Sequence, residues 1–156
     1  MNIDLNLHEY RAFLKLKKTA DQKNLVYDPI RKKYISIQPE EVVRQLLLQY
    51  IIHNELYPKN LIQVEKSIVV NDMIRRFDIV IYDKSIHPFI LIEVKSHTLK
   101  LNQSAFDQVA RYNIALKAPY LVLTNGVSTQ CARIDHELGE FEFLDSLPSL
   151  PSNEVL

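Results

Sequence analysis

The chain has 156 residues, of which 47% are hydrophobic and 24% are charged, a composition typical of one globular domain. Its 19 basic and 19 acidic residues cancel, so bulk electrostatics alone cannot hold it on nucleic acid. The two glycines are too few for the glycine-rich loops that bind nucleotide phosphates. The single cysteine, Cys131, excludes an internal disulfide and a cysteine-based zinc site.

The sequence shows neither of the two patterns typical of membrane or secreted proteins. No apolar run approaches the length of a membrane span, and the first residues lack the order of a signal peptide. We therefore expect a cytoplasmic protein with no membrane partner. One domain is predicted over residues 1–145, with short strands in 1–37 and a core in 38–145. Residues 146–156 contain two prolines and three serines and are predicted to form a flexible tail.

The predicted elements begin with short strands and one well-marked helix. The strands are expected at 12–18, 24–27 and 34–37, with a turn at 28–33. Pro39 suits the first position of the helix, and the following acids complement its positive end. An apolar stripe for the core then repeats with helical spacing at Val43, Leu46, Leu47, Tyr50 and Ile51. The helix should end before Tyr57.

The second half of the chain alternates strands with one more helix. A hairpin is predicted from 62–70 and 74–83, joined by a tight turn at Asn71 and Asp72. The segment 89–95 is almost wholly apolar until its charged end, as in a buried central strand. The remaining elements are a helix at 102–117 and strands at 120–124, 129–135 and 141–144.

The informative constellation combines two acids and a lysine on neighbouring strands. If Tyr82 pairs with Phe89 in an antiparallel hairpin, Asp78 falls opposite Glu93, because paired residue numbers keep a constant sum. Alternation places Asp78 on one face with Val80 and Tyr82, and Glu93 with Leu91 and Lys95. Opposed Cβ atoms lie about 5 Å apart, which leaves room for one divalent ion.

This arrangement has a chemical and a plain structural interpretation. Buried carboxylates need a cation, and Mg²⁺ prefers oxygen ligands while keeping several waters. Lys95 could then orient a water for attack on phosphorus or neutralise the charge that develops there. The competing interpretation is a surface salt bridge at the end of a strand.

Further residues carry the same two interpretations. Gln108 and Tyr112 lie one turn apart on the second helix and could bond a phosphate or a nucleotide edge, or form an ordinary exposed face. Glu41 is either a helix-dipole carboxylate paired with Arg44 or part of a site. The basic runs 15–18 and 31–33 could contact phosphates, although such runs usually form a solvated surface.

At this point the sequence resembles the PD-(D/E)xK nucleases, most closely the N-terminal nuclease domain of type I restriction enzyme R (motor) subunits. The resemblance covers roughly residues 27–134 and runs through YDPIRKKY, PEEVVRQ, VEKSI, RRFDIVIYD, ILIEVK, FDQVARYN and YLVLTNG. It implies an α/β restriction-endonuclease-like fold with a central mixed sheet flanked by helices. It also implies Mg²⁺-dependent hydrolysis of DNA phosphodiester bonds, with Mn²⁺ as a substitute.

Carried over position by position, the resemblance makes Asp78 and Glu93 the metal-binding carboxylates, assisted by the backbone carbonyl of Val94. Lys95 is then the catalytic lysine. The supporting positions are the QxxxY pair Gln108 and Tyr112, the acid Glu41, and the weaker candidates Glu65 and His97. Phe77 stands where the family pattern has proline.

The implied partners are DNA and the motor, specificity or methylation subunits of a restriction system, with a homodimer as a further option. Two alternatives stay open. One is a DNA-binding or assembly module that keeps the nuclease fold without useful cleavage. The other is a small dimeric nuclease that repairs DNA or resolves junctions.

Overall fold

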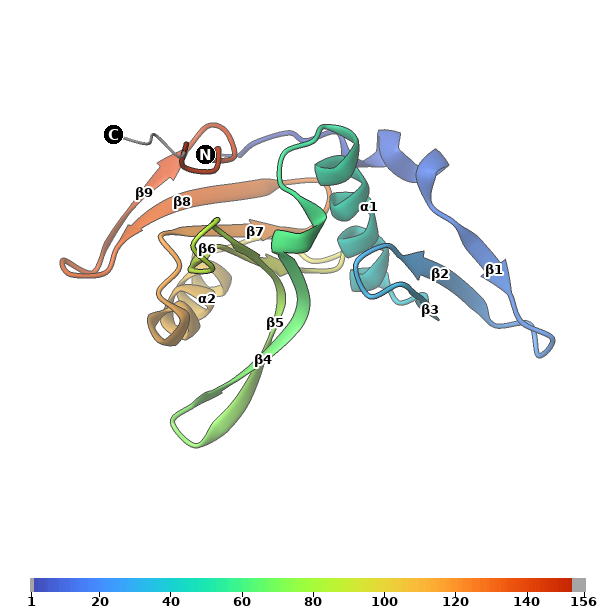
Figure 1. Cartoon of the computed structure of the whole chain (residues 1–156), viewed down its shortest axis with the longest axis horizontal. Helices are drawn as coiled ribbons and strands as arrows, with labels where there is room; N and C mark the ends of the chain where they lie inside the picture. Colours follow the sequence, from blue (N-terminus) through green and yellow to red (C-terminus); the bar gives the residue numbers. More distant parts are fainter. Residues whose placement is uncertain (1, 153–156) are drawn as a thin grey trace.

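A computed structural model describes residues 2–152, and its centre is a six-stranded mixed sheet (Figure 1). The strand order follows the chain, and every neighbouring pair is antiparallel except β6 and β7. The strands are β4 (Ile62–Val70), β5 (Met73–Tyr82), β6 (Pro88–Val94), β7 (Tyr120–Thr124), β8 (Thr129–Asp135) and β9 (Glu140–Leu144). The parallel pair is joined by α2 (Gln103–Leu116), as a crossover connection requires.

The two longer helices cover opposite faces of this sheet. The helix α1 (Pro39–His53) packs Leu47 and Ile51 against Ile79 and Ile92 in one buried cluster. On the other face, α2 contributes Phe106 and Val109 to a second cluster. The prediction of a mixed sheet flanked by helices is confirmed. In the part of the chain that the structure describes, no helix combines the length and apolarity needed to cross a membrane.

A small second sheet lies beside α1, on the side away from the β4–β5 hairpin (Figure 1). It consists of β1 (Leu16–Lys18), β2 (Asn24–Asp28) and β3 (Lys33–Ser36). The strand predicted over 12–18 is wrong in its first part, because Leu7–Phe13 forms a 3-10 helix, η1. Phe13 stacks on His53 of α1 at 3.8 Å between ring centroids, a tertiary contact that local alternation does not encode.

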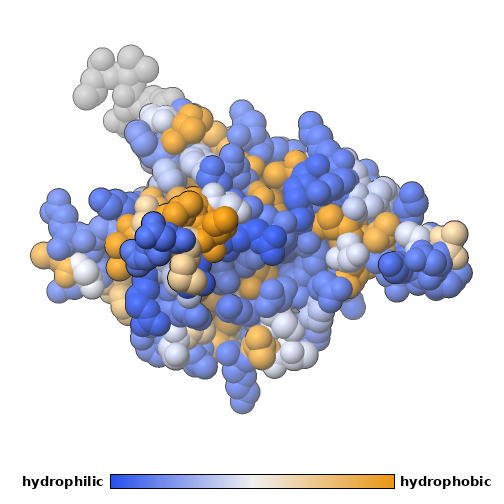
Figure 2. Space-filling model, turned by 90° about the horizontal axis from the view of Figure 1, so that it is seen from below, coloured by the Kyte–Doolittle hydropathy of each residue, from blue (hydrophilic) through white to orange (hydrophobic). Residues whose placement is uncertain are grey.

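The remaining connections are short. Lys59–Leu61 form a second 3-10 helix, η2, before β4. The turn between β4 and β5 consists of Asn71 and Asp72, both with positive φ, as a two-residue hairpin turn needs. This hairpin projects from the body of the molecule, and its tip carries exposed hydrophobic residues visible from below (Figure 2).

The end of the chain differs from the predicted flexible tail over residues 146–152. Leu147 and Leu150 pack against the α1-side core, and the Tyr57 hydroxyl donates a 2.6 Å hydrogen bond to the Pro148 carbonyl. Burial of two leucines gives this segment a reason to stay on the surface of the sheet. Residues 153–156 of the expected tail lie outside the described residues.

Candidate active site

The site lies where β5 and β6 meet, and the pairing of these strands sets its geometry. Ile79 pairs with Ile92, and Val80 with Leu91, and Asp78 and Glu93 are the residues directly beyond the last pair of this ladder. The predicted Tyr82–Phe89 pair is wrong, because Tyr82 pairs with Pro88 after a register irregularity. The irregularity lies at the turn end of the hairpin, so it leaves the pairs next to the two acids unchanged.

Asp78 does not follow the expected alternation along β5. Phe77 and Val80 both pack in the α2-side cluster, so the two-residue period breaks between them. The Asp78 carboxylate instead reaches α1, where its Oδ1 accepts a 2.8 Å hydrogen bond from Arg44 Nη2. Its Oδ2 accepts a 2.8 Å hydrogen bond from the backbone N–H of Val94. Glu65 of β4 lies next to Asp78 across the β4–β5 register and has a positive φ of 57°. Local irregularities in a strand, such as bulges, change the direction in which side chains point and are frequent near active sites.

Glu93 and Lys95 complete the centre of the site from the end of β6. The Glu93 side chain is 22% exposed, and its Oε1 lies 3.4 Å from Lys95 Nζ. The backbone N–H of Lys95 donates to the Thr124 carbonyl at 2.8 Å, which fixes the chain direction just beyond β6 against β7. The backbone that carries both side chains is therefore hydrogen-bonded to Asp78 of β5 through Val94 and to Thr124 of β7 through Lys95.

The electrostatics of Glu93 are unusual for a carboxylate. Burial, together with repulsion from and a hydrogen bond with Asp78, raises the pKa of Glu93 to about 8. Attraction by the Lys95 ammonium opposes this rise without cancelling it. The shift thus arises first from burial and then from the neighbouring Asp78 carboxylate, and carboxyls shifted in this way are frequent at functional sites.

A buried network of charges adjoins these acids on the α1 side. The Arg44 side chain is 7% exposed and contacts three carboxylates, with Nη1 lying 3.1 Å from Glu41 Oε2 and 3.3 Å from Glu65 Oε1. Its third contact is the bond to Asp78. Among the described residues, Arg44 Nε and Gln45 Oε1 are buried without a hydrogen-bond partner. Arg44 thus links the α1 acid to the strand acids.

Arg31 performs a similar linkage from the small sheet. It reaches Glu41 at 2.7 Å and Glu65 at 3.0 Å, and its Nε donates to Asp28 Oδ2 at 2.7 Å. Asp28 is fully buried and also accepts bonds from the backbone N–H groups of Ile30 and Arg31. The sequence predicted a turn and a basic run here but no role for Asp28 or Arg31 at the site. An Asp followed by Pro and, three residues on, by Arg is a signal of a turn stabilised by a side chain.

The structure therefore gathers most, but not all, of the candidate residues. Asp78, Glu93, Lys95, Glu65 and Glu41 form one connected cluster through Arg31 and Arg44. His97 is exposed in the turn after β6.

Gln108 and Tyr112 form a separate pair on α2. The Gln108 amide donates to the Tyr112 hydroxyl at 3.2 Å. Arg75 of β5 stacks over the Tyr112 ring at 4.7 Å from its centroid. Arg75 stands three residues before Asp78 in β5, so this contact relates the pair to the strand that carries the site.

The donor set suits a hard divalent cation of the Mg²⁺ type. In the described part of the chain, no group of three or more His, Cys, Asp or Glu residues is placed so that it could hold a metal ion. Mg²⁺ commonly takes only one or two carboxylates and keeps several waters, and Asp78 and Glu93 supply that number. Val94 lies beside them through its bond to Asp78, and the excess negative charge favours a cation.

Comparison with known proteins adds a family to this geometry. A family model described as type I restriction enzyme R protein N terminus matches residues 39–148, most of the chain. The chain belongs to this family. The match runs from the start of α1 past the end of β9 and so includes every residue of the cluster except Arg31 and Asp28.

A solved structure agrees with this family and gives the fold. The structure is a fragment described as an HsdR subunit of a type I restriction enzyme from Vibrio vulnificus, with a TM-score of 0.50 and 16% identity. The alignment covers 72% of this chain and 24% of the Vibrio vulnificus chain. The matched part therefore spans about a quarter of the length of that solved chain. The fold is restriction-endonuclease-like, as predicted. No curated protein matches the chain.

Proposed function

We propose that this R-subunit-like domain is a metal-dependent DNA endonuclease that hydrolyses phosphodiester bonds at Asp78, Glu93 and Lys95. The observation that carries the proposal is the proximity of two acids, Asp78 and Glu93, next to a lysine at 3.4 Å, with the pKa of Glu93 raised to about 8. Carboxyl groups with strongly shifted pKa values are concentrated at functional sites, and a bound cation would stabilise the charged form of Glu93. Membership of the R-protein family supports DNA as the substrate.

In this proposal each residue has a distinct role. Asp78 and Glu93 hold Mg²⁺, or Mn²⁺ in its place, with the Val94 carbonyl as a further ligand. The chemistry that the metal supplies when bound is neutralisation of phosphate charge and greater acidity of water. Lys95 donates hydrogen bonds that hold the attacking water or a phosphate oxygen in line with the scissile bond.

The remaining polar residues position the site and its substrate. Glu41 and Glu65 hold Arg44 and Arg31, and these arginines fix the acids of the site relative to α1. Gln108 and Tyr112 contact the DNA backbone from α2. Motor, specificity and methylation subunits are the proposed partners, because the matched family is the N terminus of the R protein of a type I restriction enzyme.

Cleavage of supercoiled plasmid by the purified chain tests the proposal. We expect nicking with Mg²⁺ or Mn²⁺, none with EDTA, and none in Asp78→Asn or Glu93→Gln. Glu142→Gln is the matched control, since Glu142 is an exposed acid on β9 that pairs only with Arg133. Equal cleavage by wild type and Glu93→Gln would contradict the proposal. Duplex binding without cleavage in any metal would favour the non-catalytic module instead.

A further inference from the structure

The outward face of the small sheet carries a row of lysine and tyrosine side chains. Tyr27 pairs with Tyr34 across β2 and β3, and the Tyr27 N–H donates to the Lys15 carbonyl on the other side. The opposite face of β2 is buried at Val26 and Asp28. The sheet thus turns an apolar and acidic side inward and a cationic, aromatic side outward.

Cation–π contacts order the lysines of this face. The Lys15 ammonium lies 5.4 Å from the centroid of the Tyr27 ring, and the Lys17 ammonium lies 5.2 Å from that of Tyr34. The two rings meet edge to face at 5.3 Å. Long lysine side chains otherwise lose rotamer entropy when they bind, so placing them over aromatic rings lowers that cost.

Charge in this neutral chain is concentrated here. Residues 15–33 contain seven basic and two acidic residues, and one of those acids is buried Asp28. In the part of the chain that the structure describes, five lysines of this segment are exposed and form no salt bridge. They are Lys15, Lys17, Lys18, Lys32 and Lys33. A hollow of about 520 Å³ at the junction with α1 adds Lys59 and His53 without an acidic lining residue.

We propose that this face, here called the lysine face (Lys15, Lys17, Tyr27, Tyr34), binds the phosphate backbone of duplex DNA. The inference rests on the proposed nuclease function and names the form of DNA that the site receives. It replaces the interpretation of the basic runs as mere solvated surface. Unpaired ammonium groups held in a row match the repeating negative charge of a strand backbone.

The geometry favours a duplex over a single strand. Proteins that hold single strands present free aromatic faces on which unpaired bases stack. Here the ammonium groups of Lys15 and Lys17 cover the faces of both tyrosines. The lysine face therefore offers charge and no stacking platform, which suits a duplex whose bases are already stacked inside.

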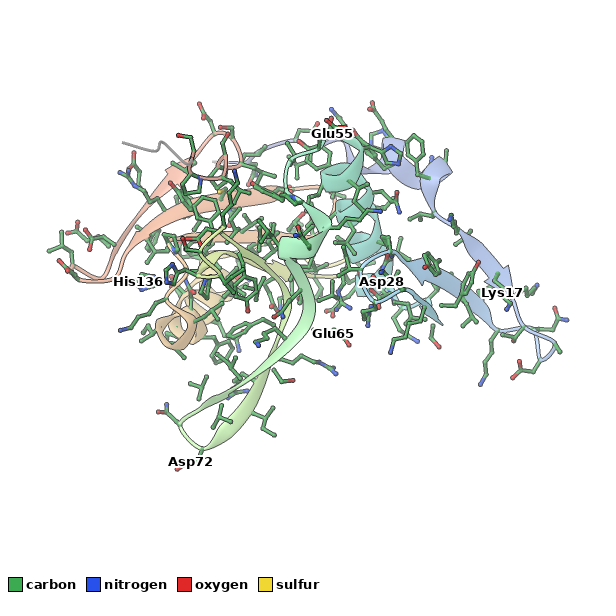
Figure 3. The ribbon with its side chains drawn as sticks, in the orientation of Figure 1. Lys17, Asp28, Glu55, Glu65, Asp72 and His136 are labelled. Carbon is green, nitrogen blue, oxygen red and sulfur yellow. The ribbon has the colours of Figure 1, made fainter. Side chains whose placement is uncertain are left out.

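The lysine face is physically coupled to the acidic cluster. Asp28 follows Tyr27 in β2, and Arg31, which it binds, extends to Glu41 and Glu65. Figure 3 shows Asp28 beside α1, between Glu65 on β4 and Lys17 on β1. From below, the surface between the small sheet and the projecting β4–β5 hairpin is mostly hydrophilic (Figure 2). The lysine face and the acidic cluster thus share strand β2, with the acids bound through its inward side and the lysines on its outward side.

Fluorescence anisotropy with a labelled 20-base-pair duplex in EDTA tests this without cleavage. We expect Lys15→Ala and Lys17→Ala each to reduce the slope of log Kd against log salt by about one. Together they should weaken binding at least about tenfold in 50 mM salt. The matched control is Lys84→Ala, an exposed lysine in the β5–β6 turn, which should leave the slope unchanged.

Tyr34→Leu tests the ordering of Lys17. We expect it to weaken duplex binding a few-fold in wild type and to have no further effect in Lys17→Ala. A single strand of the same length distinguishes the two forms of DNA. If Tyr34→Leu weakens single-strand binding and leaves duplex binding unchanged, the face is a stacking platform and the assignment to duplex is wrong.

The outcomes separate this inference from the proposed function. Wild-type duplex affinity in Lys15→Ala/Lys17→Ala overturns the lysine face and leaves the nuclease proposal standing. Lysine-dependent duplex binding by a chain that cleaves nothing in Mg²⁺ or Mn²⁺ supports the lysine face and overturns the nuclease proposal. A wild-type chain without measurable affinity for duplex at 50 mM salt overturns the lysine face.

Discussion

Two buried carboxylates within one connected cluster are treated in opposite ways by the fold. Asp28 accepts bonds from two backbone N–H groups, the Arg31 guanidinium and the Gln45 amide. Burial alone would raise the pKa of Asp28, but these bonds outweigh it and the net pKa is lowered. Glu93 has only Lys95 as a cationic partner, and burial with its neighbour Asp78 raises its pKa to about 8.

The difference separates a carboxylate that stabilises the fold from one that the fold leaves short of positive charge. Asp28 ties the small sheet to α1 and needs nothing further. Glu93 is most stable when it gains a proton or a cation. Changing each residue should therefore move stability in opposite directions.

The largest effect is expected from Asp28→Asn. The change leaves Arg31 and Gln45 with a neutral, partly mismatched partner, and removing one member of a buried ion pair costs about 3 kcal/mol or more. Urea denaturation at pH 7 measures the loss in the free energy of unfolding. Asp21→Asn is the control, an exposed acid in the β1–β2 turn, and should change stability far less. If Asp28→Asn lost no more stability than Asp21→Asn, Asp28 would not be a carboxylate that stabilises the fold.

The next effect concerns Lys95, the one cation beside Glu93. We expect Lys95→Ala to cleave plasmid at least about 100-fold more slowly, as loss of a group that stabilises developing charge does. Mn²⁺ binding should persist, because an ammonium is not a metal ligand. Titration calorimetry and timed nicking assays measure the two quantities, with Lys84→Ala as the control. Wild-type cleavage by Lys95→Ala would remove this lysine from the site.

Glu93→Gln should raise the free energy of unfolding, whereas Asp28→Asn should lower it. In metal-free protein at pH 8, replacing the destabilised carboxylate by an amide should raise the free energy of unfolding by about 1 kcal/mol or more, since one pKa unit corresponds to about 1.4 kcal/mol. Urea denaturation in EDTA gives the value, and Glu142→Gln should leave it unchanged within about 0.5 kcal/mol. A loss of stability in Glu93→Gln would show that Glu93 is a structural ion-pair partner.

The stability contributions of Glu93 and Asp28 should also depend on pH in opposite directions. Because the pKa of Glu93 is raised in the folded state, the folded chain holds a proton that the unfolded chain has lost, so wild type loses stability between about pH 4.5 and 8. The advantage of Glu93→Gln should grow over this window and be absent below it. Asp28, with a lowered pKa, contributes stability above its ordinary value of 3.8 and loses it as the pH falls further. Denaturation curves from about pH 2 to 8 measure both.

The sequence was sufficient for elements whose determinants are local. The apolar spacing from Val43 to Ile51 predicted α1, and Asn71-Asp72 predicted the turn of the β4–β5 hairpin. The proximity of Asp78 and Glu93 was expected from a constant register sum. The pairs next to the two acids keep this sum, because the irregularity at Tyr82 lies at the other end of the ladder.

The sequence was insufficient where distant segments decide the result. Arg31 lies in a turn of the small sheet, and only the tertiary fold brings it to Glu41 and Glu65. Phe13 was expected in a strand, but its contact with His53 belongs to a 3-10 helix packed on α1. The break in alternation that turns Asp78 toward Arg44 likewise depends on packing of Phe77 against the α2-side core.

The most direct test of the claim that Asp78 and Glu93 form a cation site is the thermal midpoint with and without Mn²⁺. A cation that binds only the folded chain at ten times its Kd stabilises it by about 1.4 kcal/mol, or about 3–6 °C for a chain of this size. We expect this rise in wild type, Lys95→Ala and Glu142→Gln, and no rise in Asp78→Asn or Glu93→Gln. A wild-type midpoint indifferent to millimolar Mn²⁺, or an equal rise in Glu93→Gln, would contradict the claim.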